Sequence, residues 1–224
     1  MFTFNKCLVK SCPNDAVSII DKNGKIADTK TYCINHIPNP AKIQADIYKY
    51  IREHDSITGL NVYGLSFKNL DISNKKFWGC NFMHCAFSKV HIEDCRIFMS
   101  IFDFSFLSDC MFLNSTLQFS SFANCQISHS LFNDGEIIKN NFNGIQAKQS
   151  SFDNSNLYNS RFLCANIENT SFRNCNLVKT DFCNSRLENV SFKLSETKVA
   201  VFDTAGSTTQ KDLNGRERIL MVEK

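Results

Sequence analysis

The chain has 224 residues, a formal net charge of +3 at pH 7 and 43% hydrophobic residues, enough apolar material for a folded core. A net charge this close to zero argues against a strongly basic nucleic-acid-binding protein. We expect neither a membrane anchor nor a signal peptide, because no apolar run is long enough to span a membrane and the first ten residues lack a signal-like run.

Residues 1–38 contain two pairs of metal-ligand residues. Cys7 and Cys12 form the first pair, and Cys33 and His36 form the second. Three thiolates and one imidazole suit a closed, tetrahedral zinc site with a structural role. The alternative is that the four side chains fill a small reduced core without metal.

A hairpin is predicted between the two ligand pairs. Residues 16–21 and 25–31 flank Asn23-Gly24, a dipeptide typical of tight β-hairpins. The arrangement looks like a treble-clef or knuckle finger, but its first ligand pair has four intervening residues where that pattern has two. Residues 1–56 hold eight Lys/Arg and six Asp/Glu without a basic cluster, so we expect no nucleic-acid partner for this module.

Residues 39–56 predict a capping helix. Asn39 is a good N-cap, and Pro40 is favoured at the first helical position. At helical spacing, one face carries Ile43, Ile47, Tyr50, Ile51 and His54. We expect this face to cover an open sheet edge in the next segment.

A five-residue repeat organises the chain from Ile57 to Phe192. Every fifth residue in this range is apolar, which gives twenty-eight consecutive centres without a slip in phase. The position two residues before each centre is mostly Ser or Cys, and the position two residues after it is often Asn or Asp. A period of five matches neither an α-helix nor a half-buried strand.

Centres twenty residues apart share a residue type. One column consists of Phe82, Phe102, Phe122, Phe142, Phe162 and Phe182, and a second Phe column runs ten residues out of step. The columns between them are aliphatic. If each turn has four sides of five residues, residues of the same type stack on one another in neighbouring coils. This predicts a parallel β-solenoid of square section with Asn and Asp at its corners.

This pattern resembles the pentapeptide-repeat family, in which a small residue, Asp or Asn, and Leu or Phe precede two variable positions. The resemblance implies an all-β, right-handed quadrilateral parallel β-helix of about seven coils over residues 57–203. Stability would then come from stacking between neighbouring coils, with a cap at each end.

The cysteines of the repeat predict a reducing environment. Six of them occupy the inward small position: Cys80, Cys85, Cys95, Cys110, Cys125 and Cys175. Those that share a column lie two or more coils apart, at least about 9.6 Å, which is too far for a disulfide. We therefore expect a cytoplasmic protein.

We expect neither catalysis nor a small-molecule substrate. The chain has eight glycines and no phosphate-binding loop, and its carboxylates and histidines are scattered around the predicted rod. Cys164 and Cys183 point outward in the repeat, but no histidine is placed to activate them. A convex rod also lacks the cleft that an active site needs.

An outward apolar stripe favours a non-catalytic protein–protein interaction scaffold. On one side, the residues that follow the centres run Trp78, Phe98, Gln118, Ile138, Tyr158 and Val178. The neighbouring corner adds Met99, Phe119, Ile101 and Phe104. Such a stripe is typical of an interface with another protein or a second copy. The alternative is that the tail of the chain covers it.

Some pentapeptide-repeat proteins bind gyrase and topoisomerase IV by imitating DNA, and this gives an alternative function. Mimicry requires a strongly negative rod. Residues 57–196 carry twelve Lys/Arg and twelve Asp/Glu, a net charge of zero. This balance disfavours the DNA-mimic hypothesis, and the absence of a basic stripe disfavours direct binding to nucleic acid.

Residues 204–224 are predicted to form a tail. After Phe202 the repeat fails, because the next centres would be Ser207 and Asp212. A polar linker then leads to four apolar residues: Ile219, Leu220, Met221 and Val222. We expect this segment to dock on the open end of its own rod or on a second copy, giving a possible homodimer.

Overall fold

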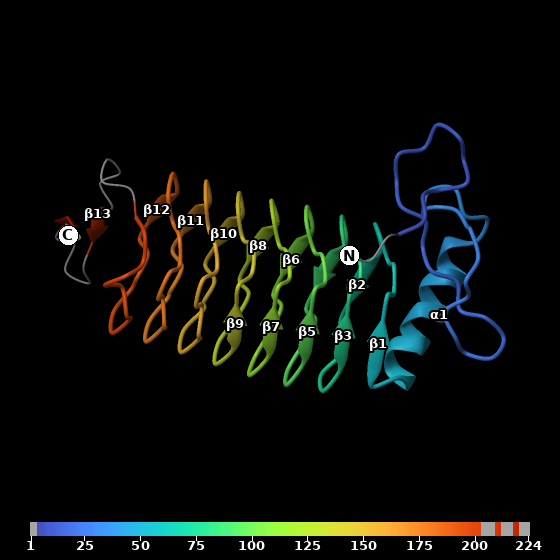
Figure 1. Ribbon diagram of the computed structural model, residues 1–224, viewed down its shortest axis with the longest axis horizontal. Coiled ribbons are helices and arrows are strands. Elements are labelled where there is room, and N and C mark those ends of the chain that lie inside the picture. The colour runs from blue at the N-terminus through green and yellow to red at the C-terminus, as the bar shows by residue number, and fades with distance from the viewer. Residues whose placement is uncertain (1–3, 203–208, 212–216, 220–224) are drawn as a thin grey trace.

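The computed structural model describes residues 4–202, 209–211 and 217–219. They form a straight rod of stacked coils, with helix α1 (Pro40–Glu53) across its N-terminal end and the short strand pair β13–β14 beyond its C-terminal end (Figure 1). The predicted right-handed quadrilateral β-helix is confirmed. None of the described helices is long and apolar enough to cross a membrane.

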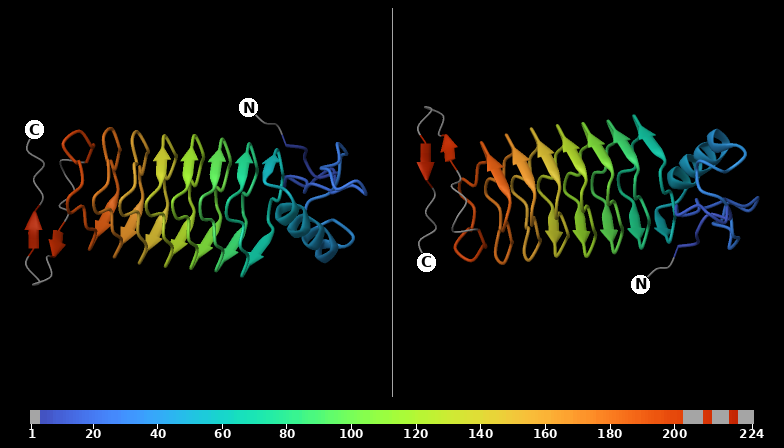
Figure 2. Two further views of the ribbon diagram at one scale, coloured as in Figure 1. Left: turned by 90° about the horizontal axis from the view of Figure 1, so that it is seen from below. Right: turned by 90° about the horizontal axis from the view of Figure 1, so that it is seen from above.

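Two opposite sides of the rod are parallel sheets of three-residue strands (Figure 2). The first sheet contains β1 (Ser56–Thr58), β3 (Lys76–Trp78), β5 (Arg96–Phe98), β7 (Thr116–Gln118) and β9 (Glu136–Ile138). The second contains β2 (Ser66–Lys68), β4 (Ala86–Ser88), β6 (Phe106–Ser108), β8 (Gln126–Ser128), β10 (Gln146–Lys148), β11 (Asn166–Glu168) and β12 (Arg186–Glu188). Every strand of these two sheets pairs with residues twenty positions away, as for Phe77 and Ile97, so the predicted coil length is correct.

The other two sides carry the Phe columns and pair through single bridges such as Asn81 with Ile101. Within one column the rings stack, and the centroids of Phe102 and Phe122 lie 4.6 Å apart at 4°. The two columns meet edge to face in the middle of the rod, with 6.2 Å between the centroids of Phe132 and Phe142 at 87°. Both arrangements suit the charge distribution of aromatic rings.

All corners of the rod use the same backbone conformation. From Gly59 to Leu194, the residue two positions after each centre has a φ between +48° and +77°. Asn, Asp and Gly adopt this left-handed region with the least strain, which explains their frequency at these positions. The recurring Asn is therefore a requirement of backbone geometry.

The inward Ser and Cys positions also satisfy backbone groups at the corners. The Ser105 hydroxyl donates to the Phe82 carbonyl at 2.7 Å and accepts from the Cys85 N–H at 3.0 Å. At Asn140 an amide does both tasks, donating to Leu117 O at 2.7 Å and accepting from Ser120 N at 2.8 Å. A buried polar atom with such partners escapes the cost of desolvation.

None of the eleven cysteines, all within the described residues, forms a disulfide. Burial raises the pKa of the Cys80 and Cys125 thiols to about 12, and that of Cys95 to about 11. These thiols stay protonated at neutral pH and are therefore poor nucleophiles.

Helix α1 closes the N-terminal end of the rod. Asn39 caps it by accepting from the Lys42 N–H at 3.0 Å, and Pro40 occupies its first position. The helix ends at Glu53, three residues before the predicted limit, because β1 already begins at Ser56. Its buried residues are Ile47, Tyr50 and Ile51, which join the core of the rod.

The hairpin predicted within residues 1–38 is only partly formed. A single antiparallel bridge joins Ile20 and Ile26 around the Asn23-Gly24 turn. Two hydrogen bonds, from the Asp21 N–H to Lys25 O and from the Ala27 N–H to Ile19 O, both at 2.8 Å, close this hairpin over residues 19–27, so it forms but is shorter than predicted. The backbone of this segment also pairs with other parts of the chain: the Ser18 N–H donates to Asn61 O of the first coil at 2.7 Å. The module thus continues the rod beyond its first coil.

A buried carboxylate joins this module to the second coil. Asp15 accepts from Lys6 Nζ at 2.6 Å and from Asn81 Nδ2 at 2.9 Å. Lys75, at an inward position, donates to the Arg52 carbonyl and pairs with Asp55 at 3.4 Å, as the one-coil spacing between the two residues suggests. Both contacts are electrostatic links at the N-terminal end of the rod.

The C-terminal end begins an eighth coil. The Phe202 ring stacks on Phe182 with a centroid distance of 5.1 Å, and Ala200 is buried. Beyond it, β13 (Thr209–Lys211) pairs antiparallel with β14 (Glu217–Ile219). Of the predicted docking residues, Ile219 belongs to β14, whereas Leu220, Met221 and Val222 lie outside the described residues. Docking of this segment stays a prediction.

The Asp103→Asn variant is expected to be less sensitive to pH than the natural protein. Burial raises the pKa of Asp103 above its ordinary value of 3.8, although Ser121 and the Ala123 N–H partly oppose this. A raised folded-state pKa means that stability falls as pH rises from 3.8 through that pKa. The side-chain oxygen of Asn would still accept the hydrogen bond from the Ala123 N–H, as Asn143 Oδ1 accepts from the Leu163 N–H at 3.0 Å.

Urea denaturation at pH 4 and pH 7 tests this prediction. Relative to the natural protein, Asp103→Asn should gain stability between the two values. The exposed corner variant Asp109→Asn is the control. If Asp103→Asn keeps the same difference from the natural protein at both values, the carboxylate does not titrate as described.

Candidate functional site

The structure brings the four predicted ligand residues of the N-terminal module together. The ligand atoms of Cys7, Cys12, Cys33 and His36 all lie within 4.8 Å of one another. Tight turns position them, because the Cys12 N–H donates to Val9 O at 2.9 Å and the His36 N–H donates to Cys33 O at 3.0 Å. The first turn carries Cys12, and the second carries both Cys33 and His36. The cluster can therefore hold a metal ion.

Three of the separations within the cluster are close to those of a tetrahedral zinc site. Zinc–sulfur bonds of about 2.3 Å and zinc–nitrogen bonds of about 2.1 Å would place two sulfurs about 3.8 Å apart, and sulfur and nitrogen about 3.6 Å apart. The Sγ atoms of Cys12 and Cys33 are 3.8 Å apart. His36 Nδ1 lies 3.4 Å from Cys7 Sγ and 3.3 Å from Cys33 Sγ.

The protonation of Cys7 suits a cation, whereas Cys12 is shifted the opposite way: the backbone of Asn14 lowers the pKa of the Cys12 thiol, but burial and the thiols of Cys33 and Cys7 outweigh it and raise that pKa. Burial raises the pKa of the Cys7 thiol, but hydrogen bonds to the backbone of Cys33 and Val9 and to the side chains of His36 and Cys33 outweigh it. The pKa falls from 9.0 to about 6. Cys7 is then a thiolate at neutral pH, which is the form that binds metal.

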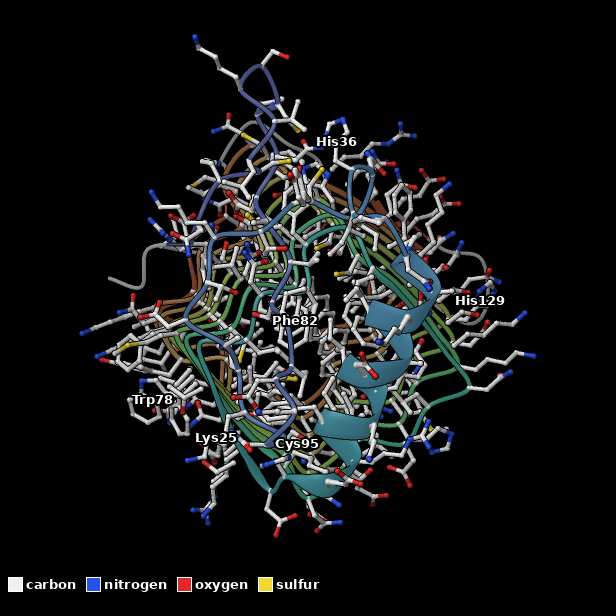
Figure 3. All side chains as sticks on the ribbon, turned by 90° about the vertical axis from the view of Figure 1, so that its right-hand side faces the viewer. Lys25, His36, Trp78, Phe82, Cys95 and His129 are labelled. Carbon is white, nitrogen blue, oxygen red and sulfur yellow. The ribbon has the colours of Figure 1, made fainter. Side chains whose placement is uncertain are left out.

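The predicted apolar stripe lies on the outside of the first sheet and continues along the same side over two further coils. We call it the apolar face and define it by Trp78, Phe98, Met99, Phe119, Ile138, Tyr158 and Val178. Trp78, Met99 and Phe119 are 45%, 49% and 53% exposed, and the others are half-buried. Seen along the rod, Trp78 points out from the wall while Phe82 fills the interior (Figure 3). Gln118 interrupts the outward column.

The corner residues of the apolar face occupy a conformation that their side chains disfavour. Met99 has a φ of +50° and Phe119 a φ of +54°. Asn or Gly would be less strained at both corners, as at Asn159 on the same side. Large apolar side chains here cost stability and remain exposed to water, so folding alone does not account for them.

Asn side chains explain why the strands of this side stop at β9. Asn156 Oδ1 accepts from the Tyr158 N–H at 3.2 Å, and Asn176 Oδ1 accepts from the Val178 N–H at 3.0 Å. These local turns replace the last strand positions. Tyr158 and Val178 therefore follow the single bridges formed by Asn156 and Asn176 on the same side of the rod.

Cations border the apolar face, a feature that the whole-rod charge does not reveal. The cations are Lys76, Arg96, Lys139 and Lys179. Between residues 76 and 179, the same side of the rod carries one acidic residue, Glu136. The adjoining side carries mainly acids: Asp71, Glu93, Asp94, Asp134 and Asp153. Sorting the charges by their position in the five-residue repeat would have shown this segregation from the sequence.

The remaining candidates form no site in the described part of the chain. His84, His91 and His129 are exposed at separate places, and Cys164 is exposed at a corner. A shallow hollow of about 180 Å³ lies over β6, β8 and β10. Ligand pockets usually measure about 300–1,000 Å³.

The family comparison agrees with the repeat. Residues 141–177 and 150–189 match the model of pentapeptide repeats, which recur in eight copies. The coils before them keep the same phase and the same corner conformation. No curated protein matches the chain.

Several solved structures are similar to the chain. HetL, a pentapeptide repeat protein involved in heterocyst differentiation regulation from the cyanobacterium Nostoc sp. strain PCC 7120, is 11% identical, with 72% of this chain and 98% of that chain covered and a TM-score of 0.35. Rfr23 from the cyanobacterium Cyanothece 51142 is 14% identical, with coverages of 70% and 97% and a TM-score of 0.35. QnrB1, a plasmid-mediated fluoroquinolone resistance protein, is 15% identical, with coverages of 66% and 92% and a TM-score of 0.34. These similarities assign no function to this chain.

Proposed function

We propose that the protein is a non-catalytic protein–protein interaction scaffold, built on the β-helix whose residues 141–189 match the model of pentapeptide repeats. Its binding surface is the apolar face, and its partner is another protein or a second copy. The observation that carries the proposal is the exposure of Met99 and Phe119 at strained corners. Exposed apolar anchors of this kind are typical of interfaces.

The DNA-mimic alternative gains no support from the distribution of charge. A mimic of duplex DNA needs acids along the surface that meets the enzyme. Here the twelve acids of residues 57–196 are spread over all four sides of the rod, with five of them on the side that adjoins the apolar face, and the apolar face itself carries four cations. We therefore retain the scaffold as the proposed function.

Replacing Met99 and Phe119 together by Asn is expected to abolish partner binding without loss of the fold. Asn suits the left-handed corners, so the midpoint of thermal unfolding should stay unchanged or rise. Removing two anchors should weaken binding at least about tenfold. Binding can be followed by photo-crosslinking from position 98 in the cells that naturally make the protein.

The crosslinking experiment has a matched control on the other sheet. Phe106 is 52% exposed in β6, outside the apolar face. A photoreactive residue at position 98 should capture a protein of defined mass, and one at position 106 should not. Equal crosslinking from both positions, or a product that survives in the double variant, would contradict the proposal.

We also propose that the N-terminal cluster binds zinc in a structural role. Four ligands leave no open coordination position, which is typical of structural sites. The ion would join two turns distant in sequence and thereby stabilise the module that contacts the first coil. The free thiols support the further proposal that the protein works in a reducing compartment such as the cytoplasm.

A further inference from the structure

We infer that the apolar face binds an amphipathic α-helix of a partner protein, with acidic side chains along the flanks of that helix. The inference rests on the proposed scaffold function and adds the chemistry of the partner. Three features of the face support it: the position of its cations, their lack of ion pairs, and the spacing of its coils.

The cations border the apolar column on both of its edges. Lys76 and Arg96 are the first residues of β3 and β5, on one edge of the column. Lys139 and Lys179 occupy corners on the other edge, with φ values of +57° and +59°. A partner that covers the column therefore meets positive charge on both flanks.

These cations are available to a partner. Among the described residues, none of the four forms an ion pair. Lys139 Nζ lies 5.4 Å from the centroid of the Phe119 ring, and Lys179 Nζ lies 5.5 Å from that of Tyr158. The Glu136 carboxylate already accepts a hydrogen bond from Asn156 Nδ2 at 2.8 Å. Carboxylates of a partner would complement the unpaired charge.

The spacing of the coils matches the turn of an α-helix. Neighbouring coils are separated by about 4.8 Å, the distance between paired strands. One turn of an α-helix rises 5.4 Å, whereas same-face residues of a strand are spaced by about 6.6 Å. A helix parallel to the rod can therefore place residues i, i+3 or i+4, and i+7 against successive coils.

The aromatic side chains supply a continuous contact surface for such a helix. The rings of Trp78 and Phe98 lie 5.1 Å apart on adjacent coils, so they form one surface. Met99 and Phe119 widen this surface. They occupy the same corner as Gly79, one coil and two coils further along the rod, and Gly79 has no side chain at that corner. Apolar positions of the helix would pack on this surface, and its acids would reach the cations at either edge.

A selection experiment tests the inference with defined probes. A display library of 15-residue helical peptides keeps apolar residues at i, i+3, i+4, i+7 and i+11, and takes its other positions at random from Asp, Glu, Lys, Arg, Gln and Ser. The full-length protein is the target. We expect the selected peptides to be enriched in Asp and Glu and to bind more weakly as salt increases.

Variants of the target separate the two contributions. Met99→Asn with Phe119→Asn should weaken binding of the selected peptides at least about tenfold, whereas Phe106→Asn, at an exposed position of β6 on the second sheet, should not. Lys139→Gln with Lys179→Gln should weaken binding about fivefold and reduce its salt dependence. The matched control for charge is Lys68→Gln with Lys89→Gln, two exposed cations of which the first lies in β2 and the second at the corner after β4.

Several outcomes would overturn the inference. They are the absence of enrichment, selected peptides with neutral or basic flanks, and binding that the Asn variants leave unchanged. Tighter binding of a single-stranded oligonucleotide, or self-association that Met99→Asn with Phe119→Asn abolishes, would assign the face to another class of partner. If peptides fail but crosslinking from position 98 still captures a protein, the scaffold stands and only the helix chemistry is wrong.

Discussion

Replacing Phe142 by Ala is expected to lower the free energy of unfolding by about 3–5 kcal/mol. Phe142 is fully buried, and its ring stacks between Phe122 at 5.0 Å and Phe162 at 4.8 Å. It also meets Phe132 and Phe152 edge to face. Ala would leave a cavity that the neighbouring coils cannot close, because backbone pairing holds their spacing.

Urea or guanidinium denaturation of the full chain measures this loss. Phe106→Ala removes a ring of the same size from the surface of β6, where Phe106 is 52% exposed, and should cost far less. A change below about 1 kcal/mol in Phe142→Ala would place this ring outside the packed core and contradict the register of the coils.

Loss of zinc from the N-terminal module is the second large expected effect. Protein purified without chelator should contain one zinc ion per chain, and Cys33→Ser should lose it. Cys33 is fully buried and contacts both Cys12 and His36, so it is central to the ligand set. Structural zinc contributes an apparent free energy of about 10–16 kcal/mol in small zinc modules.

Metal analysis and hydrogen exchange together test this prediction. In Cys33→Ser the exchange protection should fall within residues 4–38, while the coils after β3 keep theirs, because repeat proteins are stabilised by neighbouring contacts. Cys164→Ser replaces an exposed thiol outside the module and should keep the zinc. Metal-free protein with normal protection of residues 4–38 would show that the four side chains form a core without an ion.

The repeat could be predicted because, at each position of the five-residue unit, one physical requirement decides which residue types are favoured. Phe142 marks a filled interior, Asn159 a left-handed corner, and Ser105 an inward position that is mostly occupied by small side chains. The structure adds that Ser105 hydrogen-bonds two backbone groups, a task that the spacing of the residues could not reveal. It also explains why Asn140 is tolerated in the core.

Other features depended on contacts between distant parts of the chain. The hairpin is shorter than predicted because Ser18 pairs with Asn61 of the first coil, a partner that the local turn at Asn23-Gly24 does not disclose. The segregation of charge was missed because counting over the whole rod cancels Lys139 against acids on another side. Both errors arise where position around the rod matters more than position along the chain.

The amino-acid sequence by itself determined the solenoid, its coil of twenty residues, the helix after Asn39 and the residues of the Cys/His cluster. It could do so because stacking identical coils imposes the same local rule at every fifth residue. Only the tertiary structure decided that the ligand atoms converge within 4.8 Å and that Met99 and Phe119 remain uncovered beside a row of cations. Convergence and exposure depend on which distant residues occupy the surrounding space, and no local periodicity contains that information.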